Sequence, residues 1–164
     1  MQQSTGMCKL HSVEINCSVH ATEDINKVRK AFLFIVPENL REKITIEETP
    51  VVGHAKNPII LLEAKVTSKK RVEKIVEHLA QEISDFEKEF LTEEFDDRVG
   101  ENNRLFIRFN KQDAYNELLT IGRSDNSIKV IIKFIIYKEQ PGLLKKTITS
   151  YGLIKKEQTD EALL

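Results

Sequence analysis

Apolar residues occupy every second position in several stretches of the chain, and this alternation predicts β-strands. The clearest example is residues 127–137, where Ile128, Val130 and Ile132 alternate with Lys129 and Lys133. Most of these stretches have one apolar face, so we expect a sheet that is covered by helices on one side. The predicted strands lie at residues 13–20, 43–48, 59–66, 104–109 and 127–137.

Between these stretches, apolar residues recur at intervals of three and four positions, which predicts amphipathic helices. Thr22 is expected to cap the first helix, and a capping box from Ser84 to Glu87 starts a later one. A short helix is expected over residues 111–119, and Pro141 is expected in the first turn of the last helix. Strands and helices therefore alternate along most of the chain.

This order of elements predicts a two-layer α+β fold. We expect a largely antiparallel or mixed sheet of about five strands, with helices on one face. The sequence contains neither an internal repeat nor a linker, so one domain is expected over residues 9–156. The terminal residues 1–8 and 157–164 are expected to be flexible.

Charge is distributed unevenly, although the formal net charge is only −1. Residues 81–102 hold nine acidic and two basic side chains, which is typical of a solvated acidic segment. Residues 103–156 hold eleven basic and four acidic side chains. Part of the basic excess falls on predicted strands, so it can be assigned to one face of the sheet.

The outward positions of the last two predicted strands combine cations with aromatic rings. Arg104, Phe106 and Arg108 point outward on one strand, and Lys129 and Lys133 point outward on the other. If the strands are neighbours, their shared face suits RNA, because cations contact phosphates and rings stack on unpaired bases. The candidate RNA-binding residues are Arg104, Phe106, Arg108, Lys111, Lys129, Lys133, Tyr137, His54 and Lys56.

The same face has an alternative interpretation. Phe106, Ile131, Ile135, Ile59 and Leu61 are apolar outward residues that would form a patch suited to a protein partner. The simplest partner is a second copy of the chain, so a homodimer is the alternative to RNA binding.

The loop at residues 53–57 also allows two interpretations. Gly53 permits a positive φ, and Asn57 precedes Pro58 and is therefore biased to extended geometry, so a turn explains both residues. A turn does not require His54 or Lys56, which are therefore candidates for phosphate contact.

Catalytic and metal sites are not expected. The sequence contains no nucleophile elbow, phosphate-binding Walker loop or dinucleotide fingerprint. Cys8 and His11, like Cys17 and His20, are three residues apart, which in a strand places them about 10 Å apart on opposite faces. We therefore expect a protein without enzymatic activity, cofactor or metal. No signal peptide or membrane span is recognised, and a cytoplasmic protein is expected.

Several segments resemble, in the same order, an archaeal family of predicted exosome-associated RNA-binding proteins. They are "VHATED", "GHAKNPIILLEAKV", "DDRV", "RLFIRFNKQDAY" and "SIKVIIKF". The resemblance covers roughly residues 12–150, and the fold of that family is likened to double-stranded-RNA-binding domains or to the fifth large-subunit ribosomal protein. The sequence departs from the pattern of that family at Lys56, where glycine is expected, and at Asn110 and Asp113, which replace an acid and an alanine. The resemblance implies an archaeal RNA-associated protein with exosome components as partners.

Overall fold

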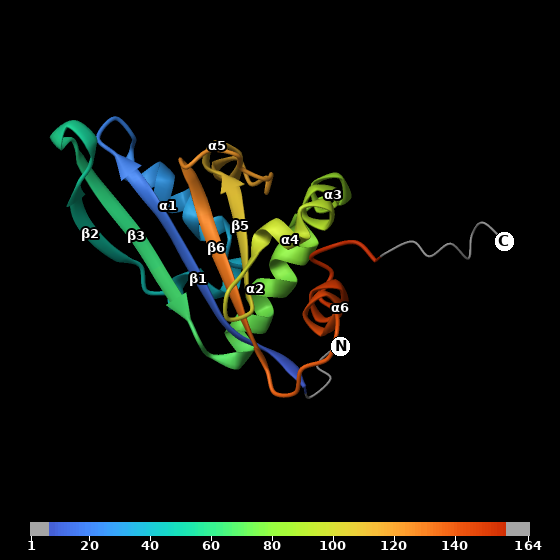
Figure 1. The fold of residues 1–164 in the computed structure, drawn as a ribbon. Coiled ribbons are helices and arrows are strands. Elements are labelled where there is room, and N and C mark those ends of the chain that lie inside the picture. Colours follow the sequence, from blue (N-terminus) through green and yellow to red (C-terminus); the bar gives the residue numbers. More distant parts are fainter. Residues whose placement is uncertain (1–6, 157–164) are drawn as a thin grey trace.

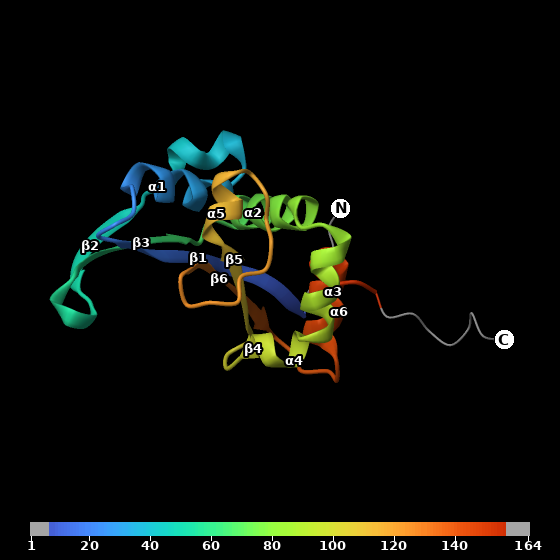
Figure 2. The same cartoon turned by 90° about the horizontal axis from the view of Figure 1, so that it is seen from above.

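The computed structural model describes residues 7–156, apart from the side chain of His54. Terminal residues 1–6 and 157–164, for which flexibility was predicted, lie outside the described part. The helices and strands, labelled in Figure 1 and, for β4, in Figure 2, are β1 (Cys8–His20), α1 (Ile25–Phe34), β2 (Glu47–Val52), β3 (Pro58–Val66), α2 (Lys69–Glu82), α3 (Asp85–Glu93), α4 (Phe95–Arg98), β4 (Val99–Gly100), β5 (Arg104–Asn110), α5 (Lys111–Tyr115), β6 (Ser127–Ile136) and α6 (Leu143–Ser150).

The strands form one antiparallel sheet of six strands in the order β2-β3-β1-β6-β5-β4. The α+β class is as predicted, but the sheet has one strand more than the expected five. The additional strand is β4, whose two residues, Val99 and Gly100, are too short a segment to show alternation in the sequence. β5 and β6 are neighbours, and this adjacency is the condition on which the predicted basic face depends.

The main core lies between the sheet and the helices α1, α2 and α5, which form a layer on one side of it (Figure 2). Ile15, Leu62, Ile107 and Ile132 come from four different strands and are all buried in the same apolar cluster, as the alternation predicts. The helices α3, α4 and α6 gather at one end of the sheet, where the Lys145 ammonium lies 5.5 Å from the centroid of the Phe95 ring.

Several predicted boundaries need correction. Asp24, rather than Thr22, caps α1, and its Oδ1 accepts a hydrogen bond of 2.8 Å from the Asn26 amide. The final helix begins at Leu143, two residues after Pro141, because Gly142 takes the capping position with φ +72°. β1 begins at Cys8, one residue before the expected domain start, because Cys8 is buried in the core.

The capping box at α3 forms only in part. The Ser84 hydroxyl accepts a hydrogen bond of 3.3 Å from the Glu87 amide, as predicted. The Glu87 carboxylate does not complete the box, since it accepts a hydrogen bond of 2.7 Å from the Ile121 amide. This contact ties α3 to the segment that follows α5.

The β2–β3 hairpin projects from the end of the sheet farthest from β4 (Figure 1). All six residues of β2 are exposed, and Val52 is the most exposed large apolar residue among those described, at 76%. At the tip, Ala55 and Lys56 have φ values of 57° and 61°, in the left-handed region. The Gly53 amide donates a hydrogen bond of 2.8 Å to the Asn57 carbonyl and closes the turn.

Candidate nucleic-acid interface

The antiparallel register of β5 and β6 places the predicted basic side chains in pairs on the face opposite the helix layer. Arg104 lies opposite Lys133, and Arg108 lies opposite Lys129. Like charges directly opposite one another destabilise a sheet, by an amount within the roughly 0.2–1 kcal/mol that such pairs contribute. We call these two pairs the cation rungs. An anion bound between their side chains would remove the repulsion.

A third pair, Phe106 opposite Ile131, lies between the two cation rungs. Phe106 as a whole residue is 39% exposed. It packs against Gly100 of β4, where an added Cβ would lie only 2.6 Å from the ring carbon Cε1. Glycine at this position therefore lets the ring lie close to the β4 backbone, while part of the ring stays open to solvent.

A cavity of about 760 Å³ opens beside Phe106. The structure brings Phe106, Arg108 and Lys129 together in its lining, as the sequence predicted for neighbouring strands. Asn16 of β1 and Ile131 of β6 also line this space. We call it the Phe106 cavity. Arg104 and Lys133 are not among its lining residues and occupy the adjacent rung.

Sequence reasoning did not identify Arg98 and Arg123, which also line the Phe106 cavity. Arg98 lies in an acidic segment and Arg123 in a loop, so the strand alternation gives no signal for either. Both bind the Glu94 carboxylate, at 2.6 Å for Arg98 and 2.7 Å for Arg123. Hydrogen bonds from these two guanidinium groups lower the pKa of Glu94, so the carboxylate is ionised at neutral pH.

The cation rungs are weakly paired with carboxylates. Among residues 7–156, Arg108 is the one rung residue with a carboxylate within ion-pair distance, and its partner Asp125 lies 3.3 Å away. The Asp125 side chain is 97% exposed, and an ion pair in that setting contributes little stability. The Nε atom of Arg104 is buried without a hydrogen-bond partner in the described part of the chain. Apart from this buried Nε atom, the charged groups of the rungs are therefore not neutralised by buried carboxylates of the described residues.

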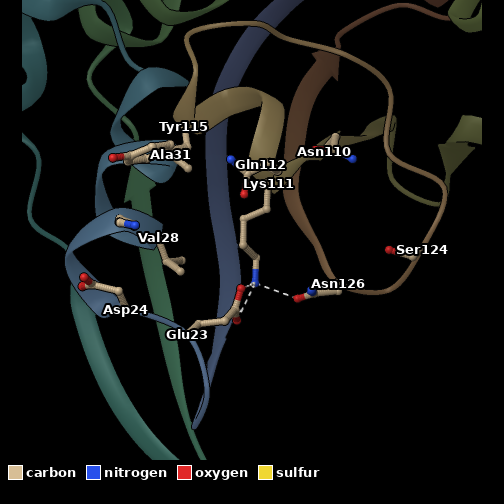
Figure 3. Close-up of a pocket in the computed structure, with 11 residues that line it drawn as sticks. Glu23, Asp24, Val28, Ala31, Asn110, Lys111, Gln112, Tyr115, Ser124 and Asn126 are labelled. Atoms are coloured by element: carbon tan, nitrogen blue, oxygen red, sulfur yellow. Dashed lines mark hydrogen bonds and ion pairs between the residues drawn. The ribbon is translucent and has the colours of Figure 1, made fainter.

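The structure removes Lys111 from the candidate surface. Its side chain is only 8% exposed, and it lies on the helix-covered side of the sheet between α1 and α5 (Figure 3). The Nζ atom donates hydrogen bonds to the Ser18 carbonyl at 2.7 Å, to the Asn126 Oδ1 at 2.6 Å and to the Glu23 carboxylate at 3.1 Å. Lys111 thus connects β1, the turn before α1 and the loop before β6, and its ammonium group has no free donor for a phosphate.

The other predicted residues lie apart from the Phe106 cavity. Tyr137 is 65% exposed beyond the end of β6, with the Lys9 ammonium 5.9 Å from its ring centroid. Lys56 is exposed at the tip of the β2–β3 hairpin, and β3 is separated from β5 by β1 and β6. The side chain of His54 lies outside the described part of the structure.

Cys8 and Cys17 are buried and not joined by a disulfide. Burial raises the pKa of Cys17 to about 12, so its thiol is protonated at neutral pH. Within residues 7–156, no three His, Cys, Asp or Glu side chains are grouped so that they would hold a metal ion. None of the helices described is both long enough and apolar enough to cross a membrane.

Residues 12–134 match the model of a protein family described as RNA binding. The chain is 30% identical over 129 residues to a Pyrococcus abyssi protein named as an RNA-binding protein, covering 78% of this chain and 84% of that one. It is 34% identical over 131 residues to an uncharacterised protein of Methanocaldococcus jannaschii, covering 78% and 87%.

The fold is also similar to solved structures. A DUF54 protein of Archaeoglobus fulgidus superimposes with a TM-score of 0.72 and 26% identity, covering 86% of this chain and 96% of that one. A DUF54 protein of Methanothermobacter thermautotrophicus gives a TM-score of 0.68 at 22% identity, covering 89% and 98%. The match to the family model spans well over half of the chain. The chain therefore belongs to this RNA-binding family, which has members in archaea.

Proposed function

We propose that the protein binds RNA through the uncovered face of β5 and β6, without catalysing a reaction. The observation that carries the proposal is the arrangement of the two cation rungs on either side of Phe106. Family membership supports RNA as the ligand. The position of the rungs supports this face as the contact surface, because their cations are not neutralised by buried carboxylates.

The salt dependence of binding tests the proposal. Each phosphate that a cation neutralises releases counterions, so log affinity falls with log salt by about 0.7 for every contact to a single strand. Four contacts from Arg104, Arg108, Lys129 and Lys133 predict a slope near −3. Replacing Arg104 and Arg108 together by alanine should weaken binding to all RNA sequences and reduce the steepness of the slope by about half.

A matched control variant removes the same number of positive charges from a different surface of the protein. Lys70→Ala with Lys74→Ala removes two exposed cations from α2, in the helix layer on the other side of the sheet (Figure 2). This variant should keep both the affinity and the slope. If the two arginines can be removed with no more effect than the two lysines, the β5–β6 face is not the binding surface.

Self-association is a second candidate function for the uncovered face, and a charge gradient across the sheet favours it. One register row runs from β2 to β5 through Glu47, Glu63, Asn16, Lys129 and Arg108. Two copies packed face to face about a two-fold axis parallel to the strands would place the acidic end of each row over the basic end of the other.

Light scattering distinguishes the two functions. A homodimer predicts twice the monomer mass at high protein concentration, and Glu47→Lys with Glu63→Lys should return the mass to that of a monomer. RNA that uses the same face should also dissociate the dimer. A wild-type protein that stays monomeric at high concentration would exclude this candidate.

We further propose that the protein acts in the cytoplasm in RNA processing or degradation, with exosome components as partners. This proposal rests on the family resemblance of the sequence rather than on a surface of the molecule. Co-purification of exosome subunits with the native protein, before and after RNase treatment, tests it. Loss of the subunits after RNase would indicate an association through RNA rather than a direct contact.

A further inference from the structure

We propose that the Phe106 cavity accepts unpaired nucleotides, so that the protein prefers single-stranded to double-stranded RNA. This inference rests on the proposed function and specifies its substrate. It follows from the width of the basic strip, from the charges on either side of it and from the position of the Phe106 ring.

The basic strip on the uncovered face is only two strands wide. The cation rungs belong to β5 and β6, which are about 4.8 Å apart. The neighbouring strands on one side carry three acidic side chains on the same face, Glu14, Glu47 and Glu63, and two basic ones, Lys9 and Lys65. The strip therefore offers cations to one phosphate backbone, and a second backbone beside it would lie over a region with more acidic than basic side chains.

The other side of the strip is bounded by a wall of the Phe106 cavity that carries no net charge. Glu94 and Asp97 line the cavity there beside Arg98 and Arg123, and both arginines are paired with Glu94. A duplex laid over β5 and β6 would have to bring its second backbone towards these carboxylates or towards Glu63. Neither position offers an excess of cations, so the charge pattern favours a single strand that runs along β5 and β6.

The length of the strip also suits a short single strand. Residues 104 and 108 are four positions apart on β5, so the two cation rungs are separated by about 13–14 Å along the strand direction. Phe106 lies midway between them. A strand with phosphates at both rungs therefore carries a base past the Phe106 ring.

The Phe106 ring requires an unpaired base. In an RNA helix the bases are stacked on one another and their faces are not available to a protein side chain. An unpaired base can stack on an exposed ring, and a cavity of about 760 Å³ is within the range of sites that enclose small ligands. Phe106 thus contributes only when the nucleotide is unpaired.

Fluorescence anisotropy with a 5′-labelled oligonucleotide tests the inference. The wild-type protein should bind a single-stranded RNA of about 12 nucleotides at least tenfold more tightly than the blunt duplex of the same sequence at the same salt concentration. Phe106→Leu should weaken single-strand binding roughly 5- to 150-fold, the range expected for loss of one base–aromatic stack, and leave the salt slope unchanged. Phe106→Tyr keeps a ring and should retain most of the affinity.

Phe86→Leu is the matched control, because Phe86 is 67% exposed on α3 and does not line the cavity. It should leave affinity unchanged. Equal or tighter binding of the duplex, or full single-strand affinity in Phe106→Leu, would overturn this inference while the Arg104 and Arg108 effects still support RNA binding. Absence of binding to both RNAs would overturn the inference and the proposed function together.

Discussion

Replacing Lys111 by methionine tests whether this lysine stabilises the fold or contacts RNA. Methionine keeps much of the length of the side chain but removes the ammonium that binds Ser18, Glu23 and Asn126. Removing one partner of a buried ion pair costs about 3–5 kcal/mol. The Glu23 side chain is 26% exposed and can recover some hydration, so we expect the lower end, about 3 kcal/mol.

For a chain of this size, that loss corresponds to a decrease in melting temperature of roughly 6–12 °C. Urea unfolding followed by circular dichroism measures the free energy, and RNA anisotropy is measured well below the transition. The folded variant should bind RNA with the wild-type salt slope, because Lys111 lies on the helix-covered side of the sheet. Combining Lys111→Met with Glu23→Leu should recover part of the stability, since no unpaired carboxylate is then left. Unchanged stability together with a slope shallower by about 0.7 would refute the structural role and indicate a phosphate contact.

Three other predictions concern residues in or near the Phe106 cavity and the core. Glu94→Gln should strengthen RNA binding, because it frees Arg98 and Arg123. The pKa of Glu94 is lower in the folded state than in the unfolded state, so the stability that the ionised carboxylate contributes is lost as the pH falls through the folded-state pKa. The melting temperature of Glu94→Gln should therefore fall less on acidification than that of the wild type. Identical dependence of the two melting temperatures on pH would contradict this. Gly100→Ala should displace the Phe106 ring and cost about 1–3 kcal/mol of stability, with weaker single-strand binding at an unchanged salt slope; wild-type affinity would show that the ring position is unimportant. Cys17 should resist alkylation near neutral pH in the folded protein and react after urea unfolding, as measured by mass spectrometry; equal labelling rates in both states would contradict its burial.

The alternation of apolar residues was sufficient to predict the faces of the long strands. Ile107 and Ile132 are buried and Phe106 is exposed, as their positions in the pattern require. Whether β5 and β6 are neighbours is a matter of long-range pairing, which the alternation within each strand does not encode. The predicted basic face therefore required β5 and β6 to be neighbours, and the order of the strands in the sheet shows that they are.

The sequence was less informative about side chains next to helix termini and in loops. Lys111 follows an outward position of β5 and was expected on the surface, but the chain turns there into α5, for which Asn110 Oδ1 accepts a hydrogen bond of 2.8 Å from the Asp113 amide. That turn directs Lys111 towards Glu23, 88 residues earlier in the chain. Arg98 and Arg123 were missed because neither lies on a strand: Arg98 pairs with Glu94 four residues earlier across one helical turn, and Arg123 pairs with it from a loop 29 residues later.

The position of β1 in the middle of the sheet has a consequence for synthesis of the protein on the ribosome. β1 is made first, yet one of its two partners, β6, spans residues 127–136 near the other end of the chain. One edge of β1 stays unpaired until β6 has left the ribosomal exit tunnel, and β6 is made more than 100 residues after β1. Pairing between such distant segments is slow, because a long loop must close before the contacts form. During this interval the backbone N–H and C=O groups along one edge of β1 lack their partners, and a chaperone would be of most use then.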